Sequence, residues 1–169
     1  MIDTEFALPG YKRILIQQEP RECWAASYGM LLRWADGGLS KEAALDRVKE
    51  RFSANKIDVK AAENRGLVPD DWPRAAVSLG MQPMAGKFVP RVHGPYFLKG
   101  LRTPVVCHLN MRSDGETYLH VVVVVGFDDA QVLFLDPEAQ NSAGVGKWKH
   151  ETWLTAARPD FGAWVPCWV

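Results

Sequence analysis

The chain has 169 residues, of which 47% are hydrophobic and 11% aromatic. This composition is sufficient for one packed domain, which we expect to cover residues 1–169, and it differs from that of a disordered chain. The 20 basic and 20 acidic residues cancel, which argues against a protein that binds nucleic acid or a membrane surface through its overall charge.

The first half of the chain carries helical patterns. Apolar residues recur at helical spacing over residues 22–35, and two glycines end this predicted helix. Ser40 is the expected N-cap of a second helix that runs through Phe52. Residues 69–79 form a third predicted helix, which opens with Pro-Asp-Asp and stops before a glycine.

The second half of the chain is richer in strand patterns. After a short predicted helix at residues 96–101, three strands are expected over residues 104–111, 118–127 and 131–135. Turn-forming residues separate the first two strands at 113–115 and the last two at 128–130. Short turns of this kind indicate an antiparallel meander.

A helical half followed by an antiparallel half predicts an α+β fold. We place the helical lobe at about residues 14–80 and the sheet lobe at about residues 81–169. Four tryptophans in the sheet lobe are expected to pack across the sheet: Trp148, Trp153, Trp164 and Trp168.

Three cysteines, Cys23, Cys107 and Cys167, are widely spaced, and none belongs to a CxxC pair. A zinc ribbon or a dense disulfide framework is therefore not expected, and we predict no cofactor and no metal site. Cys107 and Cys167 are expected to be small buried residues, with a disulfide between them as the alternative.

Cys23 lies where a proline-containing loop meets the first predicted helix. The partial positive charge of a helix N-terminus favours the thiolate, which is the nucleophilic form of cysteine. The backbone N–H of Cys23 is also available there as a donor to an oxyanion. A glutamine side chain is a candidate for the second donor, and either Gln17 or Gln18 is suitable; on an extended segment the two point to opposite sides.

A nucleophilic cysteine needs a general base, and four histidines compete for this role. His93 lies in a loop rich in proline and glycine, His108 lies inside a strand and His150 in a charged stretch. His120 opens a run of five valines, which is typical of a central buried strand whose end a cleft reaches. The alternative is a core histidine bonded to a backbone carbonyl.

Asp136 ends the strand that follows His120 and is the candidate to orient its imidazole. A three-residue loop at 128–130 pairs Phe127 with Gln131 and therefore Val122 with Asp136, which makes Asp136 a diagonal neighbour of His120. A loop of two or four residues moves Asp136 to the opposite face of the sheet. The predicted pairing therefore depends on this turn.

The residues from Gln17 to Ala26, with Cys-Trp opening a long helix, resemble the papain-like cysteine peptidase superfamily. Histidine followed by valines and glycine, and a later Asp-Pro, resemble compact bacterial members: the peptidases that trim double-glycine leaders and the related secreted effector proteases. In this superfamily the oxyanion glutamine lies six residues before the cysteine, so the resemblance favours Gln17 over Gln18. It implies a papain-like fold with Cys23 on the central helix and Asp136 where plant and animal relatives carry asparagine.

The resemblance implies a cysteine peptidase that acts on a protein or peptide through an acyl-enzyme, with Cys23, His120, Asp136 and Gln17 as catalytic residues. A deamidase or transamidase, and a papain-like interaction module without activity, are the alternatives. A metal held by Cys107, His108 and His120 is disfavoured, because adjacent strand residues point to opposite faces.

The expected biological setting is that of a bacterial effector or toxin domain, with a housekeeping leader peptidase as the competing case. No secretory signal and no membrane-spanning run is visible, so we expect a protein that is cytoplasmic as synthesised. In the effector setting it is delivered to another cell by a secretion system that needs no signal peptide. We also expect a monomer. The expected partners are the substrate and a cognate immunity protein, without nucleic acid or membrane.

Overall fold

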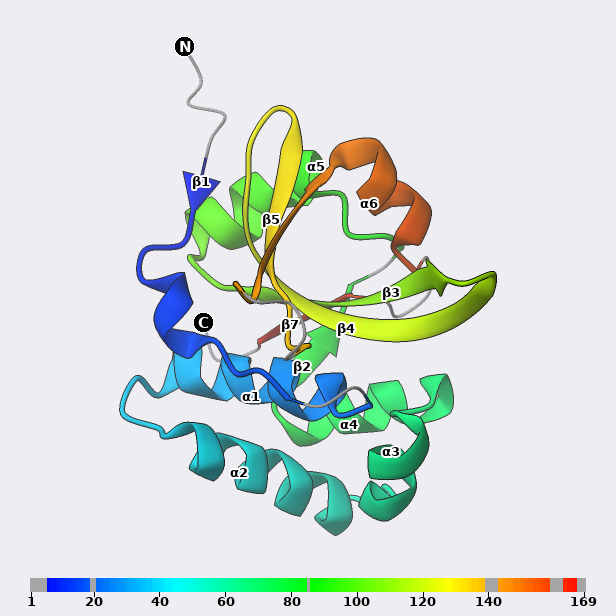
Figure 1. The fold of residues 1–169 in the computed structure, drawn as a ribbon. Coiled ribbons are helices and arrows are strands. Elements are labelled where there is room, and N and C mark those ends of the chain that lie inside the picture. The colour runs from blue at the N-terminus through cyan, green and yellow to red at the C-terminus, as the bar shows by residue number, and fades with distance from the viewer. Residues whose placement is uncertain (1–5, 19–20, 85, 139–142, 159–162, 167–169) are drawn as a thin grey trace.

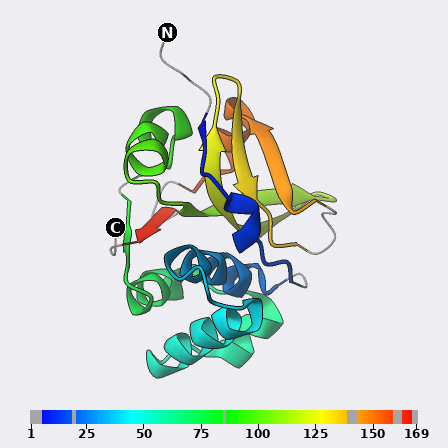
Figure 2. The ribbon, with the colours of Figure 1, turned by 90° about the vertical axis from the view of Figure 1, so that its left-hand side faces the viewer.

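The computed structural model describes residues 6–18, 21–84, 86–138, 143–158 and 163–166. The helices of the first half lie against one side of a twisted sheet, as the two views in Figures 1 and 2 show. The prediction of a mixed fold with a helical half and an antiparallel half is confirmed. None of the described helices is long and apolar enough to cross a membrane.

The helical half contains four α-helices and two 3-10 turns among the described residues: η1 (Tyr11–Ile14), α1 (Cys23–Ala35), α2 (Lys41–Ala54), α3 (Val59–Arg65), η2 (Pro69–Asp71) and α4 (Trp72–Ser78). The first two predicted helices are confirmed, and the Ser40 side chain caps α2 by accepting a hydrogen bond from the Ala43 N–H at 3.1 Å. The third predicted helix divides into η2 and α4. Helix α3 was not predicted.

Helix α1 lies at the centre of the molecule, between the sheet and α2. Every residue from Cys23 to Leu31 is buried, although the sequence pattern indicated one apolar stripe. Gly29 allows the close approach, because a Cβ there would lie 3.1 Å from Ile16 and 3.6 Å from Ala44 of α2. The start of α1, which carries Cys23, is therefore held from several sides.

The described residues form one sheet of seven strands, of which all but the first lie in the second half: β1 (Phe6–Ala7), β2 (Met81–Pro83), β3 (Val105–Ser113), β4 (Glu116–Phe127), β5 (Gln131–Leu135), β6 (Val145–Lys149) and β7 (Ala163–Pro166). The order is β2-β7-β3-β4-β5-β6, with β1 beside β4, and all these pairs are antiparallel. The predicted meander β3-β4-β5 is confirmed. Helices α5 (Pro90–Gly94), η3 (Pro95–Gly100) and α6 (His150–Ala156) complete this half.

The pairing of β4 with β5 differs from the prediction at the turn. Phe127 pairs with Val132 rather than with Gln131, and the Asp128 N–H donates to the Gln131 carbonyl at 2.9 Å. This shift alone would turn Asp136 away from His120. A β-bulge between Val124 and Gly126 shifts the register back, so that Val123 pairs with Leu135.

Two of the four tryptophans form an aromatic cluster on the sheet, as expected. The ring centroids of Trp148 and Trp153 lie 5.1 Å and 5.9 Å from that of Phe134. Cys107 is a buried free thiol in β3. Trp168, Cys167 and the side chain of Trp164 lie outside the described residues.

Candidate active site

Cys23 is the first residue of α1, and its side chain reaches a cavity of about 670 Å³ between the helical half and the sheet. The helical half contributes the following residues to its wall: Arg21, Cys23, Trp24, Trp72 and residues 65–69. The sheet half contributes His108, Glu138 and residues 117–121, which include His120. Cys23 and His120, chosen from sequence as nucleophile and base, therefore border the same cavity.

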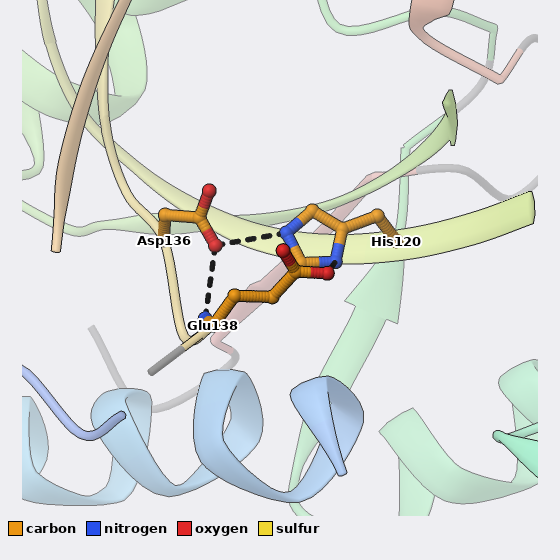
Figure 3. A group of neighbouring side chains, drawn as sticks. All are labelled: His120, Asp136 and Glu138. Atoms are coloured by element: carbon orange, nitrogen blue, oxygen red, sulfur yellow. Dashed lines mark hydrogen bonds and ion pairs between the residues drawn. The ribbon is translucent and has the colours of Figure 1, made fainter. Parts of the chain in front are cut away.

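His120 and Asp136 lie side by side, as Figure 3 shows, with the Nε2 of His120 2.9 Å from the Oδ1 of Asp136. Asp136 is itself fixed, because its Oδ1 also accepts a hydrogen bond from the Glu138 N–H at 3.0 Å. The strand pairing expected to bring the two residues together is thus realised, through the bulge rather than through the turn.

The surroundings of His120 favour its protonated form. Burial of the ring lowers its pKa, but hydrogen bonds to Asp136 and Cys23 and the negative charge of both raise it to about 10. Since Nε2 is bonded to Asp136, the other nitrogen, Nδ1, is left for Cys23. The arrangement is chemically that of an imidazolium placed between a carboxylate and a cysteine sulfur.

A direct hydrogen bond ties the helix of Cys23 to the strand of His120. The Ser27 hydroxyl, one turn after Cys23, donates to the backbone carbonyl of Val121 at 2.8 Å. Both groups are buried, so this bond fixes the position of α1 relative to β4.

Gln17 and Gln18 both contact the segment that follows Asp136. The Gln17 side chain donates from Nε2 to the Glu138 carbonyl at 3.0 Å, and the Gln18 N–H donates to the Pro137 carbonyl at 2.7 Å. The segment that leads to Cys23 is thereby attached to the segment that follows Asp136. Neither glutamine is among the described residues that line the Cys23 cavity.

The histidines at 93 and 150 make local structural contacts. The Nδ1 of His93 accepts a hydrogen bond from the Val89 N–H at 2.9 Å, and the Nε2 of His150 lies 2.8 Å from the Asp128 carbonyl. These contacts anchor the ends of short helices. His108, in contrast, is fully buried and borders the cavity of Cys23.

Three residues of the site were not predicted from the sequence: Glu138, Tyr118 and His108. An Oε1 atom of Glu138 lies 3.7 Å from the Nδ1 of His120, and the Tyr118 ring centroid lies 6.3 Å from that of His120. Burial and then the negative charges of Glu138, Asp136 and Cys23 raise the pKa of Tyr118. Spacing offered a signal for two of them, since Tyr118 precedes His120 and Glu138 follows Asp136 by two residues.

His120, Asp136 and Glu138 offer three ligand atoms within 4.8 Å of one another. In this arrangement the Nε2 of His120 is hydrogen-bonded to Asp136, so this nitrogen is not free for an ion. Cys107 and His108, the other metal ligands weighed from the sequence, are not part of this group.

Comparison with known proteins identifies the family and the fold. Residues 5–152 match the model of a protein family described as papain-like cysteine protease AvrRpt2. The fold is similar to the crystal structure of the peptidase domain of Streptococcus ComA, a bifunctional ABC transporter involved in quorum sensing, with a TM-score of 0.56 and 17% identity over 89% of this chain and 93% of that one. No curated protein sequence matches the chain significantly. Because the family model covers most of the sequence, the chain belongs to this family and is a papain-like cysteine protease.

Proposed function

We propose that the protein cleaves a peptide bond with Cys23 as nucleophile, His120 as general acid and base, and Asp136 as the residue that orients His120. The observation that carries this proposal is the hydrogen bond between Asp136 and His120 at the wall of the cavity that Cys23 also borders, together with the effect of Cys23 on the pKa of His120. A sulfur, an imidazole and a carboxylate in this order are the components of nucleophilic acyl transfer.

In the first step the Cys23 thiolate attacks the carbonyl carbon of the scissile bond, and the negative charge moves to the carbonyl oxygen. The Cys23 N–H is the proposed donor to this oxyanion, and the Gln17 amide is the proposed second donor, through the N–H that does not bond the Glu138 carbonyl. The tetrahedral intermediate collapses to a thioester as His120 transfers its Nδ1 proton to the leaving amine.

In the second step water attacks the thioester while neutral His120 accepts its proton. The carboxylate product leaves and the thiolate–imidazolium pair is restored. Asp136 keeps its hydrogen bond to Nε2 throughout, so Nδ1 stays directed to the reacting atoms.

Two cavities suit an extended peptide on either side of this centre. The Cys23 cavity shares Tyr118, His120 and Glu138 with a second cavity of about 530 Å³ on the sheet half. The second cavity is lined further by Trp148 and the glycine-containing segment 143–146. A peptide that passes His120 would occupy both cavities, with the scissile bond where they meet.

Thiol labelling tests the nucleophile and includes an internal control. Cys107 is buried, and burial raises the pKa of its thiol well above the ordinary value, so it should react slowly. We expect iodoacetamide or E-64 at neutral pH to modify Cys23 much faster than Cys107, as measured by mass spectrometry, and this preference to fall in His120→Ala. Slow and equal labelling of both cysteines would instead indicate an interaction module without catalysis.

We further propose that the protein is an effector or toxin domain that acts on a protein of another cell and is held inactive at home by an immunity protein. Its support is the resemblance to bacterial papain-like effector proteases. Expression of wild type and Cys23→Ala in bacterial cytoplasm, followed by growth measurement and mapping of new protein N-termini, tests this role. Growth arrest that needs Cys23 supports an effector, whereas harmless expression of both contradicts it.

A second candidate is a leader peptidase, which the structural likeness to a transporter peptidase domain favours. Incubation with peptides that contain a double-glycine leader distinguishes it, since a leader peptidase cleaves after the two glycines. Deamidation or transamidation by the same residues would be detected by mass spectrometry as a modified glutamine without a new terminus.

A further inference from the structure

The cavity of about 530 Å³ on the sheet half, called the sheet-side cavity below, has an excess of negative charge in its wall. Its described lining contains two carboxylates, Asp136 and Glu138, against the single positive charge of protonated His120. No lysine or arginine belongs to this described lining, whereas Arg21 and Arg65 line the Cys23 cavity. The two cavities that adjoin at His120 therefore differ in charge.

The two carboxylates of the sheet-side cavity differ in their contacts. Asp136 is bonded to the Nε2 of His120 at 2.9 Å. The Glu138 carboxylate lies beside the same ring (Figure 3), but its nearest oxygen is 3.7 Å from Nδ1, beyond hydrogen-bond length. Among the ion pairs of the described residues, Glu138 faces no other cation. The Glu138 carboxylate can therefore accept hydrogen bonds from a further cationic group.

Glu138 is held in place by its backbone rather than by its side chain. Its N–H donates to the Oδ1 of Asp136 at 3.0 Å, and its carbonyl accepts from the Gln17 side chain at 3.0 Å. Its side chain is 22% exposed and borders both cavities. A carboxylate that is largely withdrawn from water attracts a partner charge more strongly than one on an open surface, because solvent screens it less.

The aromatic part of the wall suits a long cationic side chain. The rings of Tyr118, Phe134 and Trp148 line the sheet-side cavity. Lysine and arginine pack their methylene stems on apolar surface, and their charged ends are attracted to aromatic faces. The negative charge also acts at the ring of Tyr118, since burial and then the charges of Glu138 and Asp136 raise the pKa of its hydroxyl.

We infer that the sheet-side cavity is a specificity pocket for a lysine or arginine of the substrate, whose charged end pairs with the Glu138 carboxylate. This inference rests on the proposed peptidase function and names the substrate residue of that site. Because Arg21 and Arg65 give the Cys23 cavity the opposite charge, the preference for a cation applies to one side of the cleaved bond only.

A peptide library tests the preference, with one residue fixed in turn at each of the three positions on either side of the cleaved bond. Lysine is compared with norleucine and arginine with citrulline, which have similar shapes without the charge. We expect the cationic residue to exceed its neutral counterpart in kcat/KM by about 5-fold or more at one position. Equal cleavage at every position, or a cationic preference on both sides of the bond, would overturn the inference.

Added salt gives a second readout from the same peptides. The ratio of arginine to citrulline cleavage should decrease as ionic strength rises, because salt screens a charge pair that is partly exposed. A ratio that does not change with salt would contradict the pairing with Glu138.

Two variants of equal design assign the preference to one carboxylate. In Glu138→Gln the ratio of arginine to citrulline cleavage should fall to about 1, while both backbone bonds of this residue are retained. Glu151→Gln is the control, since Glu151 lines a neighbouring groove and not the sheet-side cavity, and its ratio should stay at the wild-type value. The ratio does not depend on the amount of folded enzyme. An unchanged ratio in Glu138→Gln contradicts the inference.

Carbon NMR of the glutamate carboxyl groups gives a readout that needs no cleavage. In Cys23→Ala, N-acetylarginine amide should shift the carboxyl signal of Glu138, and N-acetylcitrulline amide should not. Equal shifts with the two amides, or none with either, would overturn the inference. If the wild type cleaves no peptide at all, the proposed function fails, and this titration still decides whether the cavity selects a cation.

Discussion

The hydroxyl of Ser27 and the carbonyl of Val121, 2.8 Å apart, connect the two halves of the molecule next to the candidate catalytic pair. Ser27 follows Cys23 by one helical turn, and Val121 follows His120 directly. The distance between the Cys23 sulfur and the His120 imidazole therefore depends on the hydrogen bond between Ser27 and Val121, two residues outside the candidate catalytic pair.

Replacement of Ser27 by alanine should affect both stability and activity. Loss of this buried bond is expected to lower the free energy of unfolding by about 1–2 kcal/mol. Because α1 and β4 are then less firmly aligned, kcat should fall more than KM rises. Chemical denaturation and peptide cleavage measure the two effects. Ser78→Ala is the control, since Ser78 bonds only within its own helix turn, to the Ala75 carbonyl.

Asp136 should tolerate asparagine better than alanine. An asparagine carbonyl still accepts the Nε2–H bond of His120, whereas alanine removes this acceptor. We expect a loss in kcat/KM of roughly 10²-fold or more for Asp136→Ala and a smaller loss for Asp136→Asn. Asp128→Asn, in the turn between β4 and β5, is the matched control. Equal losses for alanine and asparagine would mean that Asp136 acts mainly through its charge.

The pH dependence of activity should show the raised pKa of His120. The imidazolium is the proton donor, so activity persists below this pKa and declines as pH rises through about 10. Asp136→Asn removes one of the negative charges that hold the proton and should move the alkaline limb of kcat/KM to lower pH. An alkaline limb near 6.5, the ordinary pKa of histidine, in the wild type would contradict this account.

Gln17 and Gln18 form a matched pair for the oxyanion donor. If the Gln17 amide stabilises the oxyanion, Gln17→Ala should lower kcat by roughly 10²-fold, in the range found for such donors. Gln18→Ala should leave kcat nearly unchanged, because the contact shown for Gln18 is through its backbone N–H. The opposite result would exchange the roles of the two glutamines.

Gly126 should tolerate no side chain. A Cβ at this position would lie 2.5 Å from the Phe6 carbonyl oxygen and 3.0 Å from the Ala7 Cα, both in the backbone of β1. We expect Gly126→Ala to lower the free energy of unfolding by about 1–3 kcal/mol as β1 is displaced. Gly37→Ala, where a Cβ meets nothing within 4 Å, should change stability little. Thermal unfolding of both variants checks this.

The sequence predicted those elements whose signals are local. Ser40 is followed by a clear helical pattern, and the valine run at 121–125 could hardly be anything other than a central strand. Cys23 was placed at a helix start by the same kind of local reasoning. Helix α3 was missed because its seven residues are too few to show a period.

The meeting of His120 with Asp136 was anticipated through the wrong turn. The predicted loop paired Phe127 with Gln131, a register of β4 and β5 that brings His120 and Asp136 together. The actual loop pairs Phe127 with Val132, which is shifted by one residue, and the bulge between Val124 and Gly126 restores the predicted register next to His120. A bulge in a run of identical valines leaves no mark in the sequence. Contacts that depend on tertiary packing, such as that of Tyr28 with His108, were likewise out of reach of periodicity.

Gln17 bonds to Glu138, and Gln18 bonds to Pro137. These bonds join distant parts of the chain, since Gln17 and Glu138 are 121 residues apart. During translation, a nascent chain therefore carries its cysteine long before it carries the partners that align it. Proteolytic competence arises only after Glu138 has left the ribosome.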